Sequence, residues 1–170
     1  MYEYRKLNPK EKAELVRQRL AKGFPAHSPP HHIQLQTFYL LTATCYEHQH
    51  HLSQSRQQLL NFIVEKFTNA GFKISAWVIL SNHYHLLVYV SDFKKLSKIF
   101  NLIHSSTSRQ WNLEDNIKGR KIWYRYHDRF IRSERHYYTT LNYIHYNPVK
   151  HNLVNFPTPK TPKEDVIGVV

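Results

Sequence analysis

With 170 residues, of which 41% are hydrophobic, the chain is long enough for one domain with its own core and too short for two independent ones. Its 24 Lys and Arg residues outnumber 12 Asp and Glu residues and give a net charge of +12, which favours polyanionic partners, nucleic acid before acidic membranes. No apolar run is long enough for a membrane span, and a signal-peptide core is missing, so we expect a cytoplasmic, nucleoid-associated protein without a membrane partner. The single cysteine, Cys45, is expected to be an inert core side chain.

Residues 1–35 are predicted to form a helical arm followed by a proline-rich linker. Asn8 and Glu11 have the spacing of a capping box around Pro9, so a helix is expected to run to about Lys22 and to stop at Gly23. The stretch "FPAHSPPHH" that follows is expected to be extended, with solvated histidines rather than a metal-binding tract. Basic residues of the arm either touch hairpin DNA or belong to a simple packing arm; they are Arg5, Lys6, Arg17 and Arg19.

Residues 36–154 are predicted to form the main domain. Runs rich in β-branched and aromatic residues predict three strands, which cover 36–46, 73–80 and 84–90, with Ser81 and Asn82 as the turn between the last two. Apolar residues at helical spacing predict two helices, one within 53–72 that Gly71 ends and one over about 92–111. The segment 121–131 is expected to be a strand or an irregular hairpin.

The last helix is expected to begin after the capping residue Ser133 and to end near Tyr146, because the residue before Pro148 is biased out of the helical conformation. Residues 155–170 contain three prolines and little pattern, and they are expected to be unstructured. The element order of the main domain is therefore β–α–β–β–α–β–α. The economical arrangement is an α+β, ferredoxin-like fold, in which helices pack on a central antiparallel sheet.

A basic and aromatic stretch precedes the last helix. Residues 118–138 hold seven Lys or Arg and six aromatic residues, with only Asp128 and Glu134 as acidic residues. Cations that hold phosphates beside rings that stack on bases are typical of single-strand binding. A solvated hairpin whose rings pack inward is the alternative. The predicted DNA contacts are Lys118, Arg120, Lys121, Arg125, Arg129, Arg132, Arg135, Trp123, Tyr124 and Lys150.

Two histidines stand one residue apart in "SNHYHLLVYV". In a strand, His83 and His85 project from the same face, so both imidazoles can offer a nitrogen to one divalent cation. A pair of hydrogen-bonded core histidines is the alternative, because an H-x-H pattern alone is short. A third ligand and a reacting group nearby would favour the metal site.

The last helix offers both of these groups. Tyr143 and Asn147 are four residues apart, so their side chains lie on one helical face, away from the core face that carries Leu141 and Ile144. The amide oxygen of Asn147 could complete a site of two imidazoles and one amide. A tyrosine hydroxyl can attack a phosphodiester that a cation polarises, which gives a covalent phosphotyrosine that an incoming hydroxyl can reverse.

At this point the sequence resembles a known family. The segments "TFYLLTATCY", "AWVILSNHYHLLVYV" and "RYHDRFIRSERHYYTTLNYIHYNPVKHNLV" are similar to the REP-associated tyrosine transposases, an IS200-like, single-tyrosine branch of the HUH nucleases. The resemblance covers about residues 36–154. It implies a ferredoxin-like HUH fold and metal-dependent cleavage of single-stranded DNA beside short imperfect hairpins.

The resemblance also implies a role for each matching residue. His83 and His85 match the metal ligands, with Tyr84 between them; Tyr143 matches the nucleophile, and Asn147 matches the polar residue that completes the site. The implied cation is Mg²⁺ or Mn²⁺, and the implied products are a 5′-phosphotyrosine and a free 3′-hydroxyl. The implied partner is single-stranded or hairpin DNA, bound by a monomer or a homodimer.

Several alternatives remain open at the level of sequence. Tyr146 and Tyr138 are rival nucleophiles, and His145 and His136 are either secondary contacts or ordinary surface or core residues. The tail "NFPTPKTPKEDVIGVV" departs from the aromatic, serine-rich end of the family, so a catalytically inactive hairpin-binding protein is a second hypothesis. A nuclease in which water attacks in place of Tyr143 is a third.

Overall fold

The computed structural model describes residues 7–21, 37–52, 56, 58–153 and 155 of the chain. The chain divides into two compact units, residues 1–34 and residues 35–170. The first unit contains helix α2 (Pro9–Ala21). Asn8 and Glu11 cap it reciprocally, because each side-chain oxygen accepts the backbone N–H of the other residue, at 2.9 Å and 2.8 Å. The capping box predicted from the sequence is thus confirmed, while the predicted stop at Gly23 lies outside the described residues.

The second unit contains four strands and three α-helices among its described residues. The elements are β1 (Thr37–Thr44), the short 3-10 helix η1 (Tyr46–His48), α3 (Gln58–Asn69), β2 (Lys73–Ile79), β3 (His83–Val90), α4 (Phe93–Glu114), β4 (His127–Phe130) and α5 (Glu134–Lys150). Apart from η1, this is the predicted order β–α–β–β–α–β–α. The predicted helix stop at Gly71 is also confirmed, since this glycine has a φ of +79° after the end of α3.

The four strands form one antiparallel sheet in the order β2–β3–β1–β4. The two strands that are first and third along the chain, β1 and β3, lie at its centre, as in a ferredoxin-like fold, so the predicted α+β fold class is confirmed. The register pairs Thr42 with His85 between β1 and β3, and His127 with Thr42 between β4 and β1. These three side chains therefore share one face of the sheet.

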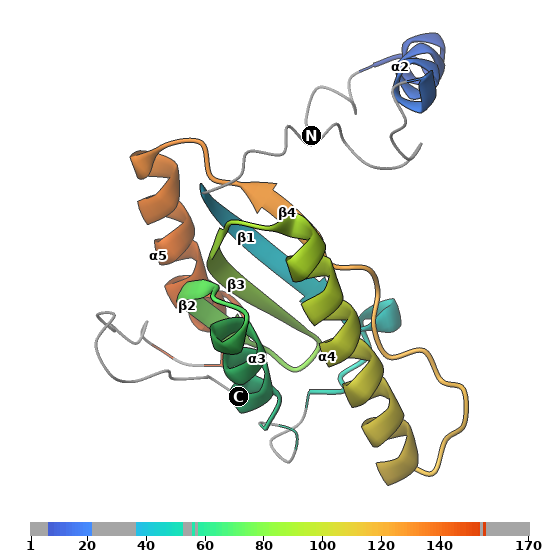
Figure 1. Ribbon diagram of the computed structural model, residues 1–170, viewed down its shortest axis with the longest axis vertical. Coiled ribbons are helices and arrows are strands. Elements are labelled where there is room, and N and C mark those ends of the chain that lie inside the picture. The colour runs from blue at the N-terminus through green and yellow to red at the C-terminus, as the bar shows by residue number, and fades with distance from the viewer. Residues whose placement is uncertain (1–6, 22–36, 53–55, 57, 154, 156–170) are drawn as a thin grey trace. The chain divides into compact units, whose positions relative to one another are not determined.

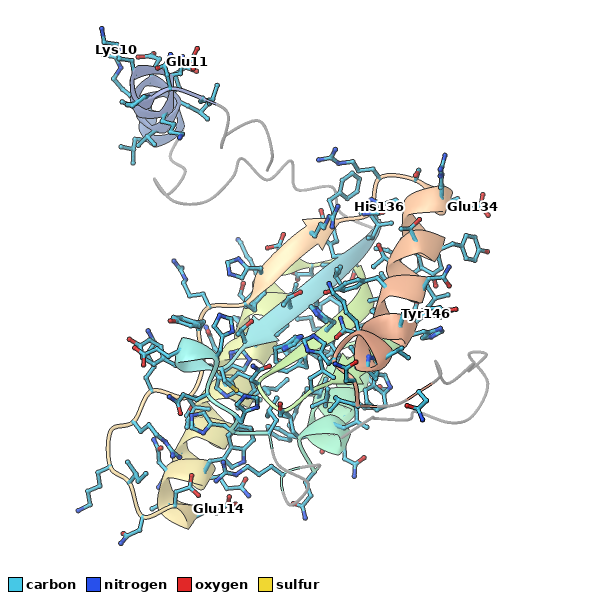
Figure 2. All side chains as sticks on the ribbon, turned by 180° about the vertical axis from the view of Figure 1, so that it is seen from behind. Lys10, Glu11, Glu114, Glu134, His136 and Tyr146 are labelled. Atoms are coloured by element: carbon cyan, nitrogen blue, oxygen red, sulfur yellow. The ribbon has the colours of Figure 1, made fainter. Side chains whose placement is uncertain are left out.

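Helices cover the two faces of the sheet differently. On one face, buried side chains of β1 and β3 such as Leu41 and Leu86 pack with Ile63 of α3 and Phe100 of α4 in the larger core. On the other face, a smaller core contains Ile144 of α5. Figure 1 shows α3 and α4 in front of the sheet, and Figure 2, from behind, shows α5 along one side of the opposite face with β1 and β4 beside it.

The segment 121–131 forms less strand than expected. Only His127–Phe130 is a strand, while Trp123 makes an isolated bridge to Cys45 at the end of β1. Cys45 is fully buried, and burial raises the pKa of its thiol to about 12, in agreement with an inert core cysteine. In the described part of the chain, none of the helices combines the length and apolar character needed to cross a bilayer.

The prediction that the last helix ends near Tyr146 is wrong. Helix α5 continues through Pro148 to Lys150, after the start that Ser133 caps as predicted. Asn147 and Pro148 are both buried, and the N–H of His151 donates to the carbonyl of Asn147 at 3.1 Å. Packing and these terminal hydrogen bonds outweigh the local bias against a helical residue before proline.

Candidate active site

The two histidines of β3 lie side by side at the α5 face of the sheet. Their ring centres are 5.0 Å apart, with an angle of 78° between the ring planes. His85 is buried and His83 is half-buried. Since His85 lies opposite Thr42 and His83 lies opposite Thr44, both project from the same face, as the H-x-H spacing predicts.

A neighbouring oxygen holds one nitrogen of each ring. Nδ1 of His83 lies 2.7 Å from the amide oxygen of Asn82, and Nδ1 of His85 lies 2.8 Å from Oγ1 of Thr42. An amide oxygen can only accept, so Nδ1 of His83 carries the proton and its Nε2 keeps a free lone pair. Metal-binding histidines are commonly oriented in this way by a hydrogen bond to the second nitrogen.

Both imidazoles are held in the neutral form. Burial lowers the pKa of His83 to about 4, with further contributions from the nearby imidazoles of His151 and His48. Burial also lowers the pKa of His85 to about 3, again with help from His83 and His151. A cation can only be bound by the neutral ring, so these side chains are ready to bind one at neutral pH.

Helix α5 brings Tyr143 to the histidines and carries a buried amide one turn later. The hydroxyl of Tyr143 forms a hydrogen bond of 3.2 Å with Nε2 of His85, and the two rings lie edge to face. One turn later, Asn147 is only 2% exposed, and its Oδ1 is buried without a hydrogen-bond partner. Residues separated by 58 positions in the chain, His85 and Tyr143, thus meet in one site.

This arrangement fits a divalent cation. Two neutral imidazoles and one amide oxygen are a suitable set of ligands, and a buried oxygen without a partner costs about 1–3 kcal/mol unless something binds it. In the described residues, no three His, Cys, Asp or Glu side chains are grouped so that they could hold a metal ion. A cation held here by described residues would therefore need an oxygen such as that of Asn147 besides the two imidazoles.

The rival side chains lie elsewhere. Tyr138 and Tyr146 are more than half exposed, and within the described part of the chain neither contacts His83 or His85. Figure 2 marks Tyr146 near one end of α5 and His136 near the other. His136 accepts the backbone N–H of Arg132 at 3.1 Å, which is a structural role at the start of α5. His145 is partly buried and makes no contact with the pair of histidines.

Most of the predicted DNA contacts are exposed: Lys118, Lys121, Tyr124, Arg125, Arg129, Arg132, Arg135 and Lys150. Two members of the predicted set are different. Trp123 is only 6% exposed, stacks on His104 and donates to Thr107 at 2.9 Å, so its ring belongs to the core and is not a surface platform for bases. Arg120 pairs with Asp115 at 2.5 Å and holds the loop against the end of α4. The burial of Trp123 was not visible from the aromatic and basic pattern.

Sequence reasoning missed two residues, one beside the predicted DNA contacts and one beside the histidines. Tyr46 lies with its ring 4.8 Å from that of Tyr124, and the ammonium group of Lys121 lies over both rings. His151 lies with its ring 5.5 Å from that of His83. No sequence pattern marks Tyr46. The spacing does mark His151, because it follows Asn147 by four residues, just as Asn147 follows Tyr143, and such residues share one helical face.

The predicted contacts of the N-terminal arm are only partly described. Arg17 pairs with Glu14 of the same helix. Arg5 and Lys6 lie outside the described residues, as does the side chain of Arg19.

Comparison with known proteins identifies a family. Residues 33–147 match the family model described as "Transposase IS200 like", a range that contains His83, His85, Tyr143 and Asn147. No protein with a curated description matches the sequence.

Two solved structures are similar to this chain. One is a REP-associated tyrosine transposase bound to a REP hairpin, with 25% identity and a TM-score of 0.59 over 75% of this chain and 76% of the other. Another is a putative transposase from Deinococcus radiodurans R1, with 14% identity and a TM-score of 0.47 over 69% of this chain and 95% of the other. The family match covers more than half of the sequence, and the chain belongs to the IS200-like transposase family.

Proposed function

We propose that this protein nicks and rejoins single-stranded DNA beside hairpins through a covalent 5′-phosphotyrosine on Tyr143. The observation that carries the proposal is the hydrogen bond of 3.2 Å between the Tyr143 hydroxyl and Nε2 of His85, one helical turn from the unpartnered oxygen of Asn147. A tyrosine hydroxyl beside a site that fits a cation supports this proposal, because phosphoryl transfer requires a nucleophile held next to the phosphate that it attacks.

His83, His85 and Asn147 would hold Mg²⁺ or Mn²⁺. When bound, the ion would polarise the scissile phosphodiester and stabilise the charge that develops on its oxygens. Asn82 and Thr42 orient the two imidazoles, and the packing of α5 on β2 and β3 fixes the distance between Tyr143 and β3.

The role of Tyr143 follows from its position. Its oxygen would form the new bond to phosphorus while the bond from phosphorus to the 3′ oxygen breaks. The phenol loses one proton and the leaving 3′ oxygen gains one, so the number of phosphodiester-type bonds is conserved. The same path, in reverse, lets an incoming 3′-hydroxyl release the tyrosine and join two strands.

DNA would approach the site over the part of this sheet face that lies beside α5, where β1 and β4 run. His127 and Thr42 lie in the same cross-strand row as His85, and the neighbouring row carries the exposed Arg129. The exposed cations of the β4–α5 region, Arg129, Arg132 and Arg135, could hold phosphates, and Tyr124 could stack on an unpaired base. A similar transposase is bound to a REP hairpin, which supports hairpin DNA as the partner. The reaction would take place in the cytoplasm, at the nucleoid.

The nucleophile can be tested with labelled hairpin oligonucleotides, Mg²⁺ or Mn²⁺, and electrophoresis under denaturing conditions. The wild-type protein should form a denaturant-resistant adduct with the fragment whose 5′ end lies at the nick, and Tyr143→Phe should reduce this adduct to background. Tyr146→Phe is the matched control, because it removes an exposed hydroxyl of the same helix, and it should retain the adduct.

Three other outcomes would separate the alternatives. An adduct at the wild-type level in Tyr143→Phe would contradict the assignment of the nucleophile. Cleavage without any adduct would indicate attack by water. Hairpin binding that survives His83→Ala and His85→Ala, with no nicked product under either ion, would indicate a DNA-binding protein without catalytic activity.

A further inference from the structure

His151 stands at the end of α5, next to the proposed metal ligands, without a role in the reaction described so far. It is the C-terminal capping residue of α5, and its backbone N–H donates to the carbonyl of Asn147. Its ring centre lies 5.5 Å from that of His83, with 60° between the ring planes. His151 is exposed, so its ring is not fixed by packing.

The position of His151 follows from the course of the helix. Tyr143, Asn147 and His151 succeed each other at intervals of four residues, so they form one stripe along α5. The stripe reaches His151 only because α5 continues through Pro148. A helix that ended near Tyr146 would leave the direction of this imidazole undefined.

The ring separations are close to those expected of imidazoles that share an ion. With metal–nitrogen bonds of about 2.1 Å, two imidazoles on one ion have ring centres roughly 5 Å apart. The separation between His83 and His85 is 5.0 Å, and the separation between His83 and His151 is 5.5 Å. The described residues hold no three histidines already grouped to hold a metal ion, so His151 must turn its exposed ring towards the site while Asn82 keeps His83 in place.

We propose that His151 is a third imidazole ligand of the divalent-cation site and makes the site prefer Mn²⁺, Co²⁺ or Zn²⁺ over Mg²⁺. The inference rests on the metal site of the proposed function. Imidazole nitrogen suits the transition ions, whereas Mg²⁺ prefers oxygen ligands and keeps several waters. Three imidazoles and one amide oxygen therefore select against Mg²⁺ more strongly than two imidazoles and one amide oxygen. The range matched by the family model ends at Asn147, four residues before His151.

The test is direct metal binding by the full chain, without DNA. Binding of Mn²⁺, Co²⁺ and Mg²⁺ is measured by calorimetry, and the visible absorption of bound Co²⁺ reports its coordination. His151→Ala should weaken Co²⁺ and Mn²⁺ binding by about ten-fold or more, the size of effect that the loss of even an outer partner produces. The Co²⁺ spectrum should change, and Mg²⁺ affinity should stay close to that of the wild type.

Two control variants make the result decisive. His145→Ala removes another imidazole of α5 that has no contact with the site, and it should leave all three affinities unchanged. His83→Ala should abolish binding of every ion. If His151→Ala binds Co²⁺ and Mn²⁺ like the wild type with the same spectrum, the inference is overturned and the proposed function stands. If His83→Ala leaves binding unchanged, the metal site of the proposed function fails as well.

Folding of the variant is checked separately. Because the His151 side chain is exposed and its contact is with a single ring, the urea midpoint of His151→Ala in the presence of a chelator should equal that of the wild type. A second variant, His151→Gln, offers an oxygen ligand at the same position. It should keep Mg²⁺ binding at least at the wild-type level while leaving Co²⁺ binding weak; recovery of Co²⁺ binding in this variant would contradict the proposal.

Discussion

Asn147 is the residue at which stability and ion binding oppose each other. Its side chain is almost fully buried, yet its Oδ1 makes no hydrogen bond. Folding removes water from this oxygen. Without an ion no partner replaces the water, which costs about 1–3 kcal/mol. Strained or unsatisfied groups of this kind are typical of functional sites, where the compensation comes from the ligand.

Asn147→Leu should therefore stabilise the metal-free protein. Leucine has the same number of side-chain heavy atoms and the same branching, but it has no polar atom to bury. We expect the free energy of unfolding in the presence of a chelator to rise by about 1 kcal/mol. Urea unfolding with chelator and with Mn²⁺ measures both effects, because ion binding to the folded state adds stability in proportion to the logarithm of ion concentration.

The wild type should gain stability from Mn²⁺, and the variant should not. A variant that is less stable than the wild type in chelator would show that the amide makes a compensating contact. Asn147→Asp is the matched control, because it keeps the oxygen and should retain the gain with Mn²⁺.

At the scale of elements, the strand that carries the histidines is supported from behind by α4. Tyr84, between the two histidines of β3, is fully buried on the other face, and its hydroxyl lies 2.9 Å from Nε2 of His104 on α4. The His104 ring is stacked on Trp123 at 4.6 Å. This packing holds β3 against the larger core, so the site on one face of the sheet depends on contacts on the other.

Stability should fall at acidic pH through His104. Burial lowers the pKa of His104 from the ordinary 6.5 to about 4, so the unfolded chain binds the proton more readily than the folded chain between these values. The contribution is complete above about pH 6.5 and is lost as the pH falls towards 4. Tyr84 is the titratable side chain in contact with the ring, and it stays protonated, since burial raises its pKa.

The comparison is urea unfolding of the wild type and His104→Gln at pH 7.5 and pH 4.5. Glutamine is neutral at both values and can still accept from Tyr84. The loss of stability on acidification should be about 2 kcal/mol smaller in the variant than in the wild type. Equal losses would show that the pKa of His104 is the same in the folded and the unfolded chain.

At the scale of the whole molecule, the net positive charge favours a polyanionic partner. The net charge is +12, and exposed cations of β4 and the start of α5 lie beside the half of the sheet that α5 leaves open, as Figure 2 shows for the ribbon. Several cations elsewhere are paired: Arg56 with Glu114 and Asp115, and Lys66 with Glu65. We expect long-range attraction to bring DNA to the protein and these exposed cations to bind its phosphates.

Hairpin affinity should therefore depend strongly on salt. Contact with about five phosphates of a single strand gives a slope of log affinity against log salt of roughly −3.5. Fluorescence anisotropy with a labelled hairpin at several NaCl concentrations measures this slope. Arg132→Ala and Arg135→Ala should each make it shallower by about 0.7.

Lys66→Ala is the control, because Lys66 lies on α3 at the opposite face and is paired with Glu65; it should not change the slope. A flat salt response of the wild type would argue against nucleic acid as the partner.

The sequence by itself determined the elements and the residue types of the site. Capping at Asn8 and Ser133, the stop at Gly71 and the apolar periodicities are local signals, and each appears in the structure where the sequence predicted it. The H-x-H spacing determined that both imidazoles share a face, because alternation along a strand is a property of the backbone.

Only the tertiary structure decided which side chains meet. The burial of Trp123, the continuation of α5 through Pro148 and the approach of His151 to His83 all depend on contacts between segments far apart in the chain. Local preference for a helix end before proline is a bias of limited energy, and packing of Asn147 and Pro148 overcomes it. The contact between Tyr143 and His85 has the same origin, because the crossing of α5 over β3 is fixed by the core beneath it and not by any residue pattern within either element.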